Sequence, residues 1–265
     1  MKMQSINPAT GEMVKEYDEM TPQQAKSSVE KSQQAFLSWR KVGFRERADC
    51  LRRAAGILRS KAGDYARLMA LETGKPVRDG RAEAEKCAWA CEYFADNGER
   101  FLLPEIIDTG AGKSYVTFMP LGVILAVMPW NYPFWQVFRC AAPALMAGNT
   151  VVMKHASNVP GCALAIEEIF RQAGFPDHVF RTILIGSDRV DALIENPLVR
   201  GVSLTGSVAA GRSVARKAGE MLKKTVLELS GSDPYLVLSD ADLAAAAAVC
   251  ASARLINCGQ SCIAA

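Results

Sequence analysis

The sequence predicts an α/β fold in which helices cover both faces of a parallel sheet, the arrangement called doubly wound. Beyond residue 120, short apolar runs of strand length alternate with longer stretches of helical periodicity. This alternation is typical of strand–helix–strand units with right-handed crossovers. The apolar runs are nearly continuous, as expected of strands that are buried on both faces. The first hundred residues have mostly helical patterns, so we expect them to pack against the sheet.

The helical part has a clear start. Thr21 is a typical N-cap, and Pro22 suits the first helical position. The residues that then fall on one stripe are Ala25, Val29, Phe36 and Trp39. Further helical patterns cover residues 45–71, with Gly63 as a candidate break, and residues 79–102. A packing role is the default for these helices.

After Pro104 the pattern changes to β-structure. Residues 114–119 alternate and residues 121–128 form an apolar run, so we expect a hairpin-like excursion that leads into a buried strand. The elements expected next are strand 150–153, helix 162–173, strand 182–185, helix 189–194, strand 201–204, helix 208–222 and strand 225–229. A ligand of such a sheet is expected at the carboxyl ends of its strands.

A second unit is expected near the end of the chain. Residues 235–238 have the pattern of a strand, Asp240 is a candidate N-cap, and residues 242–256 form an alanine-rich helix. The chain stops three residues beyond Cys262, so this unit is unfinished. The expected domains are therefore residues 1–107 with 120–229, an excursion at 108–119, and the incomplete start of a second α/β domain at 230–265.

Composition argues against several classes of protein. The 265 residues are 49% hydrophobic and 22% charged, which is ordinary for a globular protein. Basic and acidic residues are interspersed and leave a net charge of +3, so no nucleic acid or anionic membrane is required as a partner. No signal-peptide pattern occurs, and the longest apolar run, residues 123–130, is far shorter than the ~20 residues of a membrane helix. We expect a cytoplasmic protein.

The eight cysteines predict neither a disulfide scaffold nor a metal site. Their positions do not form the framework of a small secreted domain, so most are expected to be reduced and buried. His155 and His178 are the only histidines, and no two cysteines have the Cys-x2-Cys spacing of a zinc site. We expect no bound metal.

Two loops resemble phosphate-binding motifs. Gly-Ala-Gly-Lys-Ser at residues 110–114 lacks the first glycine of a P-loop, because that position is Ile107, so a turn is expected there. Residues 203–211 instead follow an apolar strand and open a helix, where backbone N–H groups and the helix dipole attract a phosphate. The alternative for this loop is a plain helix start capped by Ser207.

Three polar side chains are candidates for chemistry. Cys262 ends the segment Asn257-Cys-Gly-Gln-Ser-Cys262, at a loop-to-helix junction of the kind that lowers the pKa of a thiol. Glu228 and Asn131 each follow an apolar strand, where a buried charge is costly unless it is used or paired. On one sheet all three can converge, and a nucleophile, a base and an oxyanion donor are the minimum set for acyl chemistry. Taken alone, the segment would favour the alternative that either cysteine, Cys258 or Cys262, is buried and inert.

These segments together resemble a known family, the NAD(P)-dependent aldehyde dehydrogenases. The resemblance runs in order along the entire chain. It is carried by Asn7-Pro-Ala-Thr-Gly-Glu12, Glu72-Thr-Gly-Lys-Pro76, Pro129-Trp-Asn-Tyr-Pro133, Ala147-Gly-Asn-Thr150, Lys154, Thr205-Gly-Ser207, Glu228-Leu-Ser-Gly231 and Gly259-Gln-Ser-Cys262. It implies an aldehyde dehydrogenase-like fold, with an NAD(P)-binding first domain, an oligomerisation hairpin that includes residues 108–119, and a catalytic domain that begins at residue 230.

The resemblance also implies roles for single residues. Cys262 would attack the aldehyde, the Asn131 amide and the Cys262 backbone N–H would hold the oxyanion, and Glu228 would activate the water that hydrolyses the thioester. Lys154 would contact the adenosine ribose, and Gly206 and Ser207 the pyrophosphate. The full set of expected cofactor contacts is Trp130, Lys154, Ser157, Gly206, Ser207, Gly211 and Leu229. The expected cofactor is NAD or NADP.

Three departures from the family pattern bear on specificity. His155 follows Lys154 where the family commonly has proline, and a surface or packing role is favoured for it over catalysis. Ser157 stands where relatives often have an acid, so repulsion of a 2′-phosphate is absent and NADP should be tolerated. Arg139 resembles an arginine of succinate-semialdehyde dehydrogenases and predicts a carboxylate-bearing aldehyde substrate, the alternative being a surface or ion-pairing arginine.

Length is the last departure, because the family's catalytic domain continues well past the cysteine. The chain is then either part of a longer enzyme, which we favour, or a truncated and catalytically silent protein of the same fold that binds nucleotide or has a structural role. A homodimer or homotetramer is the assembly that the resemblance implies.

Overall fold

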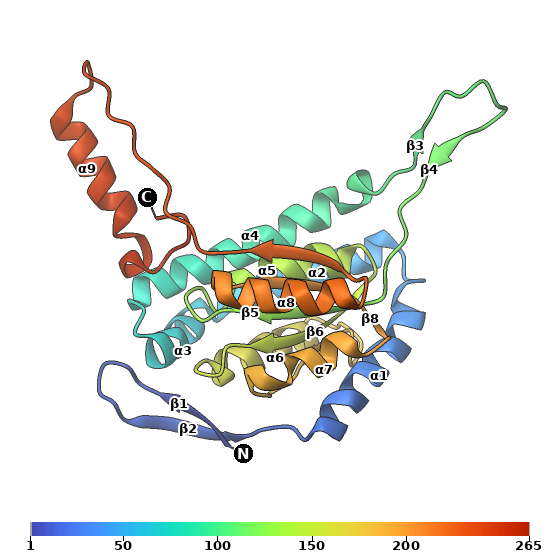
Figure 1. Cartoon of the computed structure of the whole chain (residues 1–265), viewed down its shortest axis with the longest axis horizontal. Coiled ribbons are helices and arrows are strands. Elements are labelled where there is room, and N and C mark those ends of the chain that lie inside the picture. Colours follow the sequence, from blue (N-terminus) through green and yellow to red (C-terminus); the bar gives the residue numbers. More distant parts are fainter. Residues whose placement is uncertain (1, 265) are drawn as a thin grey trace.

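A five-stranded parallel sheet organises the part of the chain that the computed structural model describes, residues 2–264 (Figure 1). Its strands are β5 (Val123–Met128), β6 (Thr150–His155), β7 (Phe180–Thr182), β8 (Val199–Thr205) and β9 (Lys224–Glu228). They lie in the order β7-β6-β5-β8-β9, and each neighbouring pair is parallel. The predicted doubly wound sheet is confirmed.

Helices cover both faces of this sheet and bury two apolar clusters. One face holds α5 (Trp135–Met146) and α6 (Pro160–Gln172), with α2 (Phe44–Ser60), α3 (Ala62–Thr73) and α4 (Val77–Phe101) packed outside them. The other face holds α1 (Pro22–Trp39), α7 (Val190–Glu195, preceded by the short η1, Ser187–Arg189) and α8 (Val208–Glu220). The chain winds from β5 toward β7 and then returns to place β8 on the other side of β5. The winding therefore reverses between β5 and β8.

The start of α1 follows the sequence signals closely. Thr21 Oγ1 accepts a hydrogen bond from the Gln24 N–H at 3.2 Å, and Gln24 Oε1 accepts one from the Thr21 N–H at 2.8 Å. This reciprocal capping box satisfies two donors that a helix start leaves free. The expected stripe is buried in full: Ala25, Val29, Phe36 and Trp39. The break between α2 and α3 falls at Lys61, two residues before the expected Gly63.

A hairpin at the amino terminus was not expected. β1 (Lys2–Ile6) pairs antiparallel with β2 (Met13–Asp18), although helical patterns dominate the first hundred residues. Only Met3 and Ser5 of β1 are buried, so the apolar alternation that announces a strand is weak. The connecting turn depends on Gly11, whose φ of 75° favours glycine.

A second hairpin projects from the body of the molecule (Figure 1). β3 (Glu105–Ile106) pairs with β4 (Tyr115–Val116), and residues 110–114 lie in the connection, which confirms the expected turn. The hairpin exposes apolar side chains, with Ile106 72% exposed. Its expected role in oligomerisation stays a prediction. No helix within residues 2–264 is long and apolar enough to traverse a bilayer.

Two expectations near the end of the chain were wrong. Residues 235–238 form no strand, because no other strand within residues 2–264 pairs with them, and Leu236 is 86% exposed. The cap of α9 (Leu243–Arg254) is Asp242, not Asp240: Asp242 Oδ1 accepts from the N–H groups of Ala244 and Ala245 at 2.9 and 3.1 Å. After α9 comes the short η2 (Ile256–Gly259), and α9 lies apart from the sheet in Figure 1.

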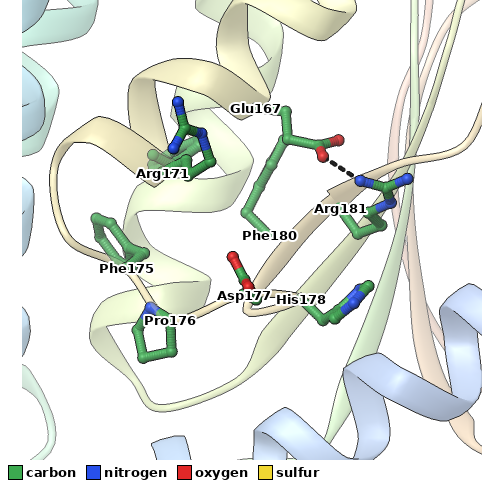
Figure 2. Close-up of a pocket in the computed structure, with 9 residues that line it drawn as sticks. Glu167, Arg171, Phe175, Pro176, Asp177, His178, Phe180 and Arg181 are labelled. Carbon is green, nitrogen blue, oxygen red and sulfur yellow. Dashed lines mark hydrogen bonds and ion pairs between the residues drawn. The ribbon is translucent and has the colours of Figure 1, made fainter.

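The edge strand β7 is anchored to α6 by one carboxylate. β7 covers 180–182 and not the expected 182–185, and Glu167 of α6 forms an ion pair with Arg181 and accepts from the Thr182 N–H at 2.6 Å. Glu167 and Arg181 line a hollow of about 210 Å³ together with Phe175 and His178. Figure 2 shows the ion pair between the Glu167 and Arg181 side chains. Because Glu167 of α6 bonds to both Arg181 and Thr182, these contacts hold the edge strand β7 against α6.

The imidazole of His155 is enclosed at the end of β6. It is 3% exposed, and burial lowers its pKa from 6.5 to about 4, with a smaller effect in the same direction from the Lys154 charge. The backbone carbonyls of Pro133 and Met128 act to raise the pKa of His155, but burial outweighs them. The folded protein therefore keeps His155 neutral at pH values where an unfolded chain would protonate it.

This burial predicts a pH dependence of stability. Between pH 6.5 and 4 the unfolded chain binds a proton at His155 that the folded chain excludes, so stability falls with falling pH by up to about 3 kcal/mol. Urea unfolding of the intact protein and of His155→Gln at pH 7 and pH 4.5 measures this. The variant should lose less stability on acidification, and two parallel profiles would contradict the argument.

Candidate active site

The polar residues expected in a site gather at one edge of the sheet. Asn131 lies three residues after β5, Lys154 is the next-to-last residue of β6, Ser207 follows β8, and Glu228 ends β9. These four strands are neighbours and run in the same direction. Their carboxyl ends therefore meet on both sides of the point where the winding reverses, which is where doubly wound sheets bind ligands.

A cleft of about 360 Å³ opens at this point. Cys262 and Asn131 both line it, together with Trp130 and Gln136 after β5, Gly206 and Ser207 after β8, and Leu229, Ser230 and Gly231 after β9. Glu228 is not among the lining residues, although its neighbour Leu229 is. The structure thus brings the thiol and the amide together in one cleft and places the carboxylate beside it.

The segment that carries Cys262 is tied to Asn131 by hydrogen bonds. The Asn131 Nδ2 donates to the Gln260 carbonyl at 2.8 Å, and the buried Asn257 Nδ2 donates to the carbonyls of Asn131 and Gln260 at 3.0 and 3.1 Å. Asn257 and Cys258 have φ of 53° and 57°, and asparagine tolerates this left-handed conformation better than most residues. An amide nitrogen has two hydrogens, so Asn131 can still donate one toward the cleft.

Two residues with no role assigned from the sequence take part in this arrangement. Asn257 connects the Asn131 and Cys262 segments. Its role follows from its hydrogen bonds in the structure and not from a sequence motif. Gln136 lines the cleft at 3% exposure, and its Oε1 has no hydrogen-bond partner among the described residues. Such a buried acceptor is costly unless water or a ligand meets it.

Glu228 faces Arg139 rather than the thiol. Its carboxylate lies 3.5 Å from Arg139 Nη1, and Arg139 Nη2 donates to Thr205 Oγ1 at 3.2 Å. The Glu228 side chain is 52% exposed, so water competes for this ion pair and its net contribution to stability is small. The arginine is therefore ion-paired here, as one of the two alternatives proposed. The substrate-binding role of Arg139 stays a prediction.

The expected cofactor contacts lie along the same edge and differ in exposure, with Lys154 and Gly211 buried and Ser157 and Ser207 exposed. Lys154 is buried, which lowers its pKa, while the Asp188 carboxylate acts to raise it, and Ser157 is exposed two residues after β6. Ser207 caps α8 by accepting from the Ala210 N–H at 3.2 Å, and a Cβ at Gly206 would make only ordinary contacts, with Ala210 and Leu204 at 3.8 and 3.9 Å. These donors at an uncovered helix start fit a pyrophosphate.

Gly211 and Leu229 determine how closely α8 approaches β9. A Cβ on Gly211 would lie 2.4 Å from Leu229 Cδ2, so the helix packs this tightly because residue 211 is glycine. The helix start next to the cleft depends on that packing. A direct cofactor contact from either residue stays a prediction.

The described cysteines form no disulfide, and their exposure differs along the chain. All eight cysteines are free, and Cys50, Cys87, Cys91 and Cys162 are buried as small apolar groups. Cys262 is partly exposed, which suits a reactive thiol. Within residues 2–264 no three His, Cys, Asp or Glu side chains are grouped so that they could hold a metal ion.

Sequence comparisons relate the whole chain to known proteins. Residues 1–265 match the profile described as the aldehyde dehydrogenase family. A protein of Synechocystis sp. named probable succinate-semialdehyde dehydrogenase, NADP(+), is 50% identical over all of this chain. Succinate-semialdehyde dehydrogenase 1, NADP(+), of Mycobacterium tuberculosis is 46% identical over the same extent. The chain spans 58% and 59% of the lengths of these relatives.

Solved structures agree with the sequence relatives. Succinic semialdehyde dehydrogenase from Streptococcus pyogenes in complex with NADP+ has a TM-score of 0.95 at 38% identity, over 99% of this chain and 58% of that one. Succinate-semialdehyde dehydrogenase from Burkholderia pseudomallei has a TM-score of 0.95 at 32% identity, over 100% of this chain and 55% of that one. The expected fold is confirmed.

The contacts of Asn257 predict the effect of its replacement. Asn257→Ala removes the donor shared by two carbonyls and should lower the free energy of unfolding by about 1–3 kcal/mol. It should also speed alkylation of Cys262 by iodoacetamide, followed by peptide mass spectrometry. Asn257→Asp is the matched control, because it keeps the shape but loses the donor. Wild-type stability in Asn257→Asp would contradict this reasoning.

Proposed function

The chain belongs to the aldehyde dehydrogenase family, and on this premise we propose that the protein oxidises a carboxylate-bearing aldehyde, succinate semialdehyde, to its acid with NADP or NAD. The observation that carries the proposal is the cleft at the reversal of the sheet. There the Cys262 thiol and the Asn131 amide meet, linked through Gln260, with the strand that ends in Glu228 adjoining. The segment after η2 supplies the nucleophile, the turn after β5 the donor, and the end of β9 the base.

These residues account for the steps of aldehyde oxidation. The Cys262 thiol gives its proton to solvent, its sulfur bonds to the carbonyl carbon, and the carbonyl π pair moves to the oxygen. The resulting oxyanion accepts from the free Asn131 N–H and the Cys262 backbone N–H. Bound NAD(P)+ supplies the acceptor for the hydride that leaves this carbon. Glu228 takes a proton from the water that attacks the resulting thioester, and the acid departs as the thiol is restored.

Arg139 supports a substrate with a second carboxylate. Its guanidinium already lies near one carboxylate, that of Glu228, and is 36% exposed, so it can bind another without breaking a buried contact. The named activity of the two curated relatives agrees with such a substrate. The distal carboxylate would then be held at α5 while the aldehyde carbon reaches Cys262.

Ser157 supports acceptance of NADP. It is exposed beside Lys154 and has no charge to repel a 2′-phosphate, and the names of both curated relatives include NADP(+). The Asp188 carboxylate also acts on Lys154, whose pKa it raises, and its negative charge would disfavour a phosphate bound close to it. The balance favours NADP with NAD also accepted.

Variants of the nucleophile and the base test the reaction. In the intact protein, Cys262→Ser should abolish NADPH formation from succinate semialdehyde. Glu228→Gln should release one NADPH per site in a burst and then turn over at least about a hundredfold more slowly, because only hydrolysis of the thioester needs the base. Stopped-flow absorbance at 340 nm measures both. A Glu228→Gln variant without a burst and with unchanged turnover would remove its role.

Replacement of Arg139 tests the substrate. Arg139→Leu should lower kcat/KM for succinate semialdehyde by about tenfold to a hundredfold, as expected for loss of a charged hydrogen bond, and should spare butanal, which has no distal carboxylate. Arg139→Lys is the control that keeps the charge without the planar fork. Equal losses on the two aldehydes would show that Arg139 acts through Glu228 and not on the substrate.

A further inference from the structure

The turn that carries Asn131 is held by side chains from two distant elements. Three successive residues at its end, Pro133 to Trp135, give their backbone groups to buried partners. Helix α5 begins at Trp135, and its cap residue Phe134 makes no side-chain cap of its own. The anchoring of this turn therefore comes from elsewhere in the fold.

His155 holds the carbonyl side of the turn. Its Nε2 lies 2.8 Å from the Pro133 oxygen, and its Nδ1 accepts from the Ala156 N–H at 2.9 Å. Because Nδ1 accepts, the ring hydrogen must be on Nε2, which therefore donates to Pro133. The enclosed, neutral ring thus has a single tautomer and joins the strand of Lys154 to the turn of Asn131.

Glu83 holds the N–H side of the same turn. Its Oε1 accepts from the N–H groups of Phe134 and Trp135 at 2.8 and 2.9 Å, so a residue of α4 caps α5. Its other oxygen binds Lys75, and both side chains are almost fully buried. The Lys75 Nζ also lies 4.1 Å from the centre of the Tyr132 ring. The negative charge thus lies at a helix start, where the dipole favours it.

We propose that His155 and Glu83 are positioning residues that clamp residues 133–135 and thereby fix where the Asn131 amide points. The clamp begins two residues after Asn131. His155 donates to the Pro133 carbonyl, and Glu83 accepts from the two N–H groups that follow it. An oxyanion donor is effective only when it is held at the position of the developing charge. The inference rests on the oxyanion role of Asn131 in the proposed function.

The clamp differs from plain packing in what it predicts. If His155 acts through Asn131, its removal matters only while Asn131 is present. If His155 merely supports the fold, its removal lowers stability and the active fraction whatever residue occupies position 131. A double-mutant cycle between the two positions separates these cases.

The cycle is measured on the intact protein with succinate semialdehyde and NADP+. His155→Leu should lower kcat/KM at least about tenfold, with the Kd for NADP+ within about twofold of wild type. His155→Gln, whose amide keeps a donor, should stay within about threefold of wild type. In an Asn131→Ala background, His155→Leu should cause no further loss. Equal losses from His155→Leu with and without Asn131 would overturn the proposal.

Glu83 is tested with its partner. In Glu83→Gln the amide nitrogen faces the Lys75 ammonium, two donors together, so the clamp should weaken and kcat/KM should fall. Adding Lys75→Met removes that conflict and lets the amide oxygen accept from Phe134 and Trp135, which should restore part of the loss. No restoration, with both variants folded by circular dichroism, would count against Glu83 as a positioning residue.

Hydrogen exchange separates failure of the clamp from failure of the proposed function. In Glu83→Gln the amides of Phe134 and Trp135, which lose the carboxylate that accepts from them, should exchange faster than in wild type, while those of β5 keep their protection, as measured by mass spectrometry on peptides. This readout needs no activity. An inactive wild type would refute the proposed function and leave this test in place, whereas unchanged exchange at 134 and 135 would refute the clamp.

Discussion

The starts of α5, α6 and α8 lie at the same carboxyl edge of the sheet, and the partners of their free N–H groups determine which of these starts stays open to a ligand. Buried carboxylates from the amino-terminal helices close two of these starts. Glu83 of α4 closes the start of α5. Glu72 of α3 closes the start of α6 by accepting from the N–H groups of Gly161 and Cys162. The start of α8 has only the short Ser207 cap and is exposed. An anion is therefore directed to α8, because the positive ends of the other two helices are already neutralised.

Because Glu72 and Glu83 close the starts of α6 and α5, the amino-terminal helices have a role in the site. Residues 72–76 lie far from the cleft in the sequence, yet Glu72 and Lys75 act on the loops that follow β6 and β5. Buried charges of this kind are costly unless fully paired, and here each carboxylate oxygen of Glu72 and Glu83 has a partner. The helices thus hold the two loops at fixed positions without touching a ligand.

Local signals in the sequence were sufficient for most of the fold and failed where the deciding contact is distant. The capping box at Thr21 and the apolar runs of the sheet can be recognised because their partners lie within a few residues. The strand expected at 235–238 was wrong, since apolar alternation does not supply a neighbouring strand. Asp240 and Asp242 both suit a cap, and only the hydrogen bonds of Asp242 distinguish them. Glu83, Asn257 and Gln136 gave no signal, because their partners are long-range.

The candidate site shows the same limit. The ends of the strands predict that Asn131, Lys154, Ser207 and Glu228 lie on one edge. They do not predict the direction of a side chain, and Glu228 turns toward Arg139.

His155 has a consequence for enzymology as well. Because the pKa of His155 is about 4, its imidazole is neutral at pH 6 and does not cause an inflection near that pH in a rate profile. If such an inflection is recorded, it has to be assigned to a group other than His155, although histidine is the usual assignment.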